Sequence, residues 1–114
     1  MSLMESLMVP LGAPCPDFTL PGVDDRLWSL RDFHTPALLV VVMCNHCPYV
    51  QAVDGRLNDL ARDYADRCAV VGINANDAVA YPEDSFEAMR RRARARGYAF
   101  PYLWDEEQAV ARAL

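Results

Sequence analysis

Three short hydrophobic runs stand out along the chain. They cover residues 37–43, 68–73 and 99–104, and the first reads Ala-Leu-Leu-Val-Val-Val-Met. A short, continuous run rich in β-branched residues is typical of a strand that is buried on both faces of a parallel sheet. We therefore expect three strands here, with residues 37–43 buried on both faces.

Two shorter strand candidates precede these runs, at residues 17–20 and 26–30. The residues between them, 21–25, read Pro-Gly-Val-Asp-Asp and are rich in turn formers. Two short strands separated by such a stretch are typical of a β-hairpin. The N-terminal part of the chain therefore predicts a small hairpin.

Helical spacing follows the first hydrophobic run. A proline is well tolerated in the first turn of a helix, so we expect Pro48 to begin one. Its hydrophobic side is formed by Val50, Val53, Leu57, Leu60 and Tyr64. This one-sided pattern predicts an amphipathic helix that packs against the sheet.

Two further helices are indicated by capping boxes. The first begins at Asp84 and Glu87 and ends at Gly97, with an inner face made of Phe86, Met89 and Ala93. The second begins at Asp105 and Gln108 and continues to the last residue.

The predicted order is a hairpin followed by β-α-β-α-β-α. Strands that alternate with helices imply an α/β fold, in which helices cover a parallel sheet. The length of 114 residues suits one domain, and we expect residues 1–114 to form a single domain.

Charge and hydropathy argue against two kinds of partner. The chain has 11 basic and 16 acidic residues and a net charge of −5, which argues against a nucleic-acid surface. Its longest hydrophobic run is far shorter than the roughly 20 residues that span a membrane. The N-terminus lacks the basic region and long apolar stretch of a secretory signal. We therefore expect a cytoplasmic protein without nucleic-acid or membrane partners.

Two of the four cysteines form the motif Cys44-Asn45-His46-Cys47, where the first hydrophobic run meets the first predicted helix. Disulfide exchange needs a thiolate, and the free N–H groups of a helix start favour one. The spacing lets Cys47 fold back to Cys44. We expect Cys44 to attack a substrate disulfide and Cys47 to resolve the mixed disulfide.

His46 is the third candidate catalytic residue. It can donate a hydrogen bond to the Cys44 thiolate, and it adds a positive charge when protonated. Either effect would lower the pKa of Cys44 and make the pair more oxidising. The alternative is that His46 is an exposed residue at the helix start without a role.

A half zinc site is the structural alternative for the motif, with His34 as a more distant ligand. Ligands as close in sequence as Cys44, His46 and Cys47 cannot easily reach one ion, and no second C-x-x-C occurs. We therefore expect no metal and no cofactor.

The other polar candidates favour simpler interpretations. Cys68 opens a predicted strand and suits a small core residue. Cys15, between two prolines, suits an exposed free thiol, with a second-site thiol as the alternative. Asn74, Asn76 and Asp77 end a predicted strand and most simply form its turn.

Several segments resemble a known family. The stretch Cys44–Val50 reads Cys-Asn-His-Cys-Pro-Tyr-Val and looks like the active site of a bacterial branch of thioredoxin-like redoxins. Asn74–Asp77 and Tyr81–Ser85 look like two further signatures of that branch. Gly12–Phe18 and Phe100–Asp105 are similar to segments shared with the peroxiredoxin (AhpC/TSA) group. The resemblance covers almost all of the chain and implies a thioredoxin-like fold with a dithiol site.

The chain also departs from that family. The fold normally continues with a cis-proline loop, two more strands and a last helix, and this sequence stops before them. The strand at 37–42 lacks the buried acid that thioredoxins use to deprotonate the resolving thiol. We expect the gene to supply the missing part and the far edge of this strand to be uncovered here, which favours association of two chains or marginal stability. The alternative is that the N-terminal segment folds over this edge.

The leading functional prediction is a thiol–disulfide oxidoreductase that acts on a disulfide-containing protein or a small thiol. A peroxiredoxin-type peroxidase is the alternative enzyme, but its Pro-x-x-x-Thr-x-x-Cys pattern fails at both Cys44 and Cys47. A truncated redoxin fold that binds partners without turnover is the non-catalytic alternative.

Overall fold

The computed structural model describes residues 11–114, so the prediction about a secretory signal lies outside the described residues. Strands β1 (Thr19–Pro21) and β2 (Leu27–Ser29) form an antiparallel hairpin, with Leu20 opposite Trp28. The predicted hairpin is confirmed. No helix in the described range is long and apolar enough to cross a membrane.

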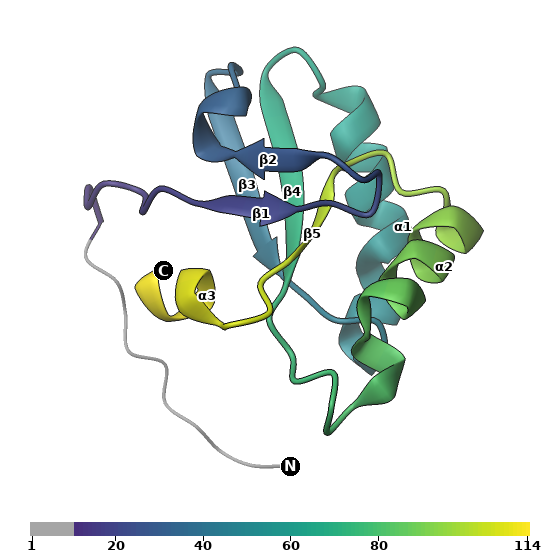
Figure 1. Ribbon diagram of the computed structural model, residues 1–114. Coiled ribbons are helices and arrows are strands. Elements are labelled where there is room, and N and C mark those ends of the chain that lie inside the picture. The colour runs from purple at the N-terminus through teal and green to yellow at the C-terminus, as the bar shows by residue number, and fades with distance from the viewer. Residues whose placement is uncertain (1–10) are drawn as a thin grey trace.

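A parallel three-stranded sheet forms the centre of the molecule. Strands β3 (Ala37–Val42), β4 (Cys68–Asn74) and β5 (Tyr102–Trp104) lie in the order β3-β4-β5. All three run in the same direction, so their carboxyl ends meet at one edge of the sheet (Figure 1). Binding and catalytic groups of open α/β sheets gather at this edge.

Helices and the hairpin cover opposite faces of this sheet. Helices α1 (Pro48–Asp63) and α2 (Phe86–Arg96) lie on one side, and the hairpin and α3 (Ala109–Ala113) lie on the other (Figure 1). The short 3₁₀ turns η1 (Leu30–Asp32) and η2 (Pro82–Asp84) precede β3 and α2. The hairpin followed by β-α-β-α-β-α is therefore confirmed, and the fold is thioredoxin-like α/β.

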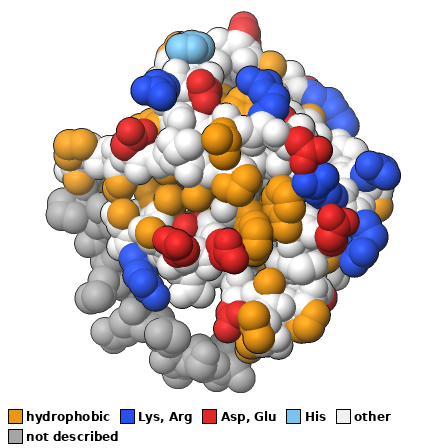
Figure 2. All heavy atoms as spheres, viewed as in Figure 1, with side chains coloured by type: hydrophobic (Ala, Val, Ile, Leu, Met, Phe, Trp, Pro, Cys, Tyr) orange, Lys and Arg blue, Asp and Glu red, His pale blue; other side chains and the backbone are white. Residues whose placement is uncertain are grey.

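The core has two parts, one on each face of the sheet. On the hairpin side its buried members are Phe18, Leu20, Val71, Ile73, Leu103 and Val110. On the side of α1 and α2 they are Met43, Ala61, Val70, Met89, Phe100 and Tyr102. Some hydrophobic side chains stay exposed, and on the face shown in Figure 2 part of them forms a band between acidic and basic side chains.

Gly72 allows close packing below the C-x-x-C motif. A Cβ atom at this position would lie 2.7 Å from the sulfur of Met43, the residue before Cys44. The missing side chain therefore lets Met43 pack on β4, which fixes the backbone from which Cys44 projects.

Four details of the predicted elements are wrong, and one of them is the start of the last helix: α3 begins at Ala109, with Gln108 and not Asp105 as its N-cap residue. β3 is not buried on both faces, because its residues are exposed or half-buried at an edge of the described sheet, and the fully buried stretch is in β4. α1 turns Asp54, Asn58 and Ala61 inward, while Val53 and Tyr64 are exposed. Polar residues therefore form part of the buried side of α1, in addition to the predicted hydrophobic side.

The predicted start of α2 is also shifted. Ser85, and not Asp84, is the N-cap residue, and its hydroxyl accepts a hydrogen bond from the Ala88 N–H. Gly97 ends α2 with a left-handed backbone, as predicted. The carboxylate of Asp84 is thus free to bind elsewhere.

A buried carboxylate joins α1 to α2. Asp54 is fully buried, and its carboxylate accepts hydrogen bonds from Arg92 at 2.5 Å and from Arg96 at 2.7 Å. The hydroxyl of Tyr98 donates a further bond at 3.2 Å. Burial by itself raises the pKa of Asp54, but the hydrogen bonds from Arg96 and Arg92 outweigh it and hold that pKa below its usual value.

We predict that Asp54→Asn lowers the free energy of unfolding by about 3 kcal/mol, because two arginines lose their charged partner. The folded pKa of Asp54 is below its unfolded value of about 3.9, so this contribution is present above that value and is lost as pH falls through the folded pKa. Denaturant unfolding at about pH 7 and about pH 3 measures this effect. The difference in the free energy of unfolding between Asp54→Asn and wild type should be smaller at the lower pH.

Asp59→Asn is the matched control, because Asp59 lies on the same helix in an exposed pair with Arg62. It should change the stability by less than about 0.5 kcal/mol. An equally small effect of Asp54→Asn would contradict the structural role of the buried carboxylate.

Candidate active site

The C-x-x-C motif lies at the carboxyl end of β3. Met43 is buried at the end of the strand, and α1 begins at Pro48, with Cys47 as its N-cap residue. Cys44 is 8% exposed, and Cys47 is half-buried. The predicted junction of strand and helix is therefore present, and it brings both thiols to the sheet edge at which the parallel strands end.

A carboxylate from a distant segment holds the loop between the cysteines. Asp84, in η2, is fully buried. Its Oδ1 accepts hydrogen bonds from the backbone N–H of Asn45 at 2.7 Å and of His46 at 3.2 Å. Its Oδ2 accepts a bond from the Asn76 amide at 2.9 Å and contacts Nδ1 of His46. One oxygen of the Asp84 carboxylate therefore binds backbone N–H groups, and the other contacts side chains.

Asn45 fastens the same loop to its surroundings. Its side-chain amide donates to the carbonyl oxygen of Glu83 at 2.9 Å, and its Oδ1 accepts a bond from the Tyr102 hydroxyl at 2.9 Å. Its carbonyl oxygen accepts a bond from the Gln51 side chain. Asn45 thus connects the motif to η2 and β5 through its side chain and to α1 through its carbonyl oxygen, which holds the loop in place.

The end of β4 and the loop that follows it hold Asp84 in position. The Asn74 amide donates to the carbonyl oxygen of Asp84 at 2.9 Å, and Oδ1 of Asn74 accepts a bond from the Asn76 N–H at 3.0 Å. Asn74 is fully buried. The interpretation of these asparagines as a turn was incomplete, because their amides also position the carboxylate at the active site.

His46 lies at the rim of the site. Its side chain is 35% exposed, and its ring stacks on Tyr81 with centroids 5.1 Å apart. One ring nitrogen faces Asp84. The imidazole therefore connects a buried carboxylate to the surface of the protein.

The expected low pKa of Cys44 is wrong for this reduced form. Burial is the largest influence and the negative charge of Asp84 is the second, and together they raise the pKa of Cys44 to about 11. The backbone N–H of Cys47 acts in the opposite direction but is weaker. Both the burial of the thiol and the presence of a carboxylate beside it depend on distant parts of the chain, so the motif alone does not reveal them.

Donor atoms of Cys44, His46 and Asp84 lie within 4.8 Å of one another. An ion placed among them would have to break the contact between His46 and Asp84 and compete with the N–H groups that already occupy the carboxylate. The arrangement therefore suits a hydrogen-bonded group better than a set of metal ligands. His34 is exposed and does not belong to this cluster.

The other two cysteines lie outside the site. Cys15 is exposed and Cys68 is half-buried at the start of β4, and all four cysteines are free thiols. The structure brings together Cys44, His46 and Cys47, and it leaves Cys15 and Cys68 apart from them.

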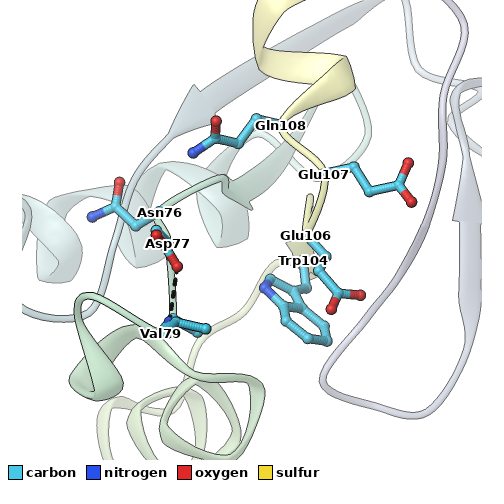
Figure 3. Close-up of a pocket in the computed structure, with 8 residues that line it drawn as sticks. Asn76, Asp77, Val79, Trp104, Glu106, Glu107 and Gln108 are labelled. Atoms are coloured by element: carbon cyan, nitrogen blue, oxygen red, sulfur yellow. Dashed lines mark hydrogen bonds between the residues drawn. The ribbon is translucent and has the colours of Figure 1, made fainter.

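A pocket of about 330 Å³ opens beside the site, between the segment after β4 and the start of α3 (Figure 3). Its lining includes the carboxylates of Asp77, Glu106 and Glu107 and the ring of Trp104. Asp77 accepts a hydrogen bond from the Val79 N–H, marked by the dashed line in Figure 3. The lining contains neither cysteine, so the pocket supplies no nucleophile of its own.

Sequence reasoning missed Asp84, Asn45 and Tyr102 as parts of the site. The one available signal was the likeness of residues 81–85 to a redoxin signature. The local pattern of Asp84 and Glu87 matched a capping box instead, and that interpretation concealed the carboxylate.

Comparisons with known proteins identify the family of the chain. The profile of the AhpC/TSA family matches residues 11–114. A conserved protein from Geobacillus kaustophilus is 46% identical, with a TM-score of 0.92 over 99% of this chain and 61% of that one. A hypothetical protein from Sinorhizobium meliloti is 43% identical, with a TM-score of 0.90 over 94% of this chain and 60% of that one. The chain thus spans less than two thirds of the length of either relative.

A more distant likeness concerns the fold alone. Peroxidoxin BcpB from Mycobacterium tuberculosis is 21% identical, with a TM-score of 0.74 over 90% of this chain and 63% of that one. No curated protein matched the sequence. The match to the family profile extends over all described residues, and the chain therefore belongs to the AhpC/TSA family of thioredoxin-like redox proteins.

Proposed function

We propose that the protein is a thiol–disulfide oxidoreductase with Cys44 as the nucleophile and Cys47 as the resolving thiol. The observation that supports this most directly is the pair of free thiols at the strand–helix junction, on a loop that buried hydrogen bonds hold in place. A preorganised loop suits a reaction in which three sulfur atoms must come into line.

The reaction proceeds in two exchanges. The Cys44 thiolate attacks one sulfur of a substrate disulfide, a Cys44–substrate disulfide forms, and the other substrate sulfur leaves as a thiolate that takes up a proton. Cys47 then loses its proton and attacks the sulfur of Cys44, and the second substrate sulfur leaves. The substrate gains two electrons and two protons, and the enzyme ends with a Cys44–Cys47 disulfide.

The substrate class we propose is a disulfide in a protein or a small thiol compound. Tyr49 and Tyr81 are exposed beside the motif and offer apolar contact surface to such a substrate. We place the reaction in the cytoplasm, where cellular thiols would return the enzyme to its dithiol form.

The edge of β3 is a second proposed feature. In the described part of the chain, β3 pairs only with β4, and Leu39 and Val42 on it are exposed. An unpaired apolar edge is a template for another strand. We propose that two copies of this 114-residue chain associate there.

The first prediction concerns the bridge itself. Mild oxidation should produce a Cys44–Cys47 disulfide that dithiothreitol reverses, because the motif brings the two thiols together. Peptide mapping by mass spectrometry measures it, and Cys68→Ser is the control that should leave it intact. A bridge that involves only Cys15 or Cys68 would overturn the proposed function.

The second prediction separates the two thiols. Cys47→Ser should accumulate a stable mixed disulfide on Cys44 when offered a disulfide substrate, because the resolving step is lost. Cys44→Ser should accumulate none. Turnover of hydrogen peroxide, with no reduction of disulfides, would favour a peroxidase, and absence of both activities would favour a binding protein.

The third prediction concerns association. Sedimentation of the 114-residue chain should show a dimer, and Leu39→Lys should shift it towards monomer, because a charge would then lie on the β3 edge. Leu27→Lys places the same charge on an exposed residue of the hairpin and should leave the dimer unchanged. A wild-type monomer at all concentrations tested would contradict the proposal.

A further inference from the structure

Asp84 places a buried negative charge beside the cysteine that has to become negative. The carboxylate and the thiol of Cys44 belong to a cluster whose donor atoms lie within 4.8 Å of one another, and Asp84 is fully buried. Two like charges at such a distance, away from water, disfavour each other strongly. Ionisation of Cys44 therefore needs a compensating proton nearby.

His46 is placed to carry that proton. Its Nδ1 contacts Oδ2 of Asp84, while part of its side chain remains open to solvent. When the imidazole is protonated, the net charge of the His46–Asp84 pair is zero. The Cys44 thiolate is then no longer opposed by an uncompensated carboxylate.

The other groups around Asp84 do not supply this charge. Cys47 at the start of α1 is itself a thiol, and Tyr81 stacks on His46. Tyr102 donates its hydroxyl proton to Asn45, and burial raises the pKa of Tyr102 above its ordinary value, so this side chain stays neutral. Among these facing groups, His46 is the one that can become a cation.

We propose that Asp84 and His46 together form the proton-holding pair of the dithiol. Asp84 is the positioning residue: it fixes the loop through the N–H groups of Asn45 and His46 and orients the imidazole. The proton that Cys44 releases passes to the pair when Cys44 attacks. The pair returns this proton to the substrate thiolate that leaves, so no proton is gained or lost at the site.

This inference rests on the proposed dithiol function and adds the source of its acid–base chemistry. Strand β3, which precedes the motif, carries no acid. The structure assigns the role to a carboxylate from η2, and Asn74 and Asn76 hold that carboxylate in position.

The test is the pH dependence of Cys44 alkylation by iodoacetamide, followed on the peptide that contains Cys44 and with a chelator present. Asp84→Asn should lower the midpoint by about one unit, which raises the alkylation rate about tenfold at a fixed pH below the midpoint. His46→Ala should lower the alkylation rate at about pH 6, where the imidazole is protonated, because the carboxylate then stays uncompensated. In the Asp84→Asn background, His46→Ala should lose most of this effect.

Glu87→Gln is the matched control, because it removes one negative charge from an exposed side chain in the first turn of α2. Its midpoint should equal that of wild type. An unchanged midpoint in Asp84→Asn together with an unchanged rate at about pH 6 in His46→Ala, or an equal shift in Glu87→Gln, would overturn the inference. If Asp84→Asn fails to fold, as judged by circular dichroism, the partly exposed His46→Ala variant decides the question alone.

The two proposals fail separately. If Cys44 alkylation is unchanged in the Asp84 and His46 variants while the protein still forms the Cys44–Cys47 bridge, the role of the pair is overturned. The proposed dithiol function is not affected by that result. A wild-type protein that forms no such bridge would overturn the dithiol function itself.

Discussion

The buried carboxylate of Asp84 is the constraint from which the rest of the site follows. A charge removed from water is tolerated only when donors surround it, and a buried charge left without them is strongly destabilising. Asp84 meets this condition with the backbone N–H groups of Asn45 and His46 and the amide of Asn76. Satisfying the charge therefore forces the loop between the cysteines and the segment after β4 into one shape.

The fold was predictable because its signals are local. The hydrophobic runs, the turn-rich stretch before residue 26 and the proline at position 48 each specify an element without reference to the rest of the chain. The inner side of α1 was not predictable in this way. Asp54 and Asn58 are buried because partners from α2 and the segment after it bond to them, as the Asp54–Arg92 pair shows. Such pairs join residues that no short window contains.

The same distinction divides the candidate active site. Cys44, His46 and Cys47 are candidates on sequence grounds because their spacing and their position at the end of a strand indicate dithiol chemistry. Asp84 lies far along the sequence, and its neighbours offered a simpler local explanation as a helix start. The position of a buried charge depends on which segments the parallel sheet brings to its carboxyl edge, and this information exists only in the assembled fold.

The balance of charges at Cys44 also bears on the direction of electron flow. A dithiol whose nucleophilic thiolate is strongly stabilised is an oxidant, because reduction gains that stabilisation. Here the helix start and the Cys47 N–H favour the thiolate, but burial and Asp84 outweigh them and raise the pKa of Cys44 to about 11. Stabilisation of the thiolate, which would make the pair more oxidising, therefore depends on the proton that the His46–Asp84 pair is proposed to hold.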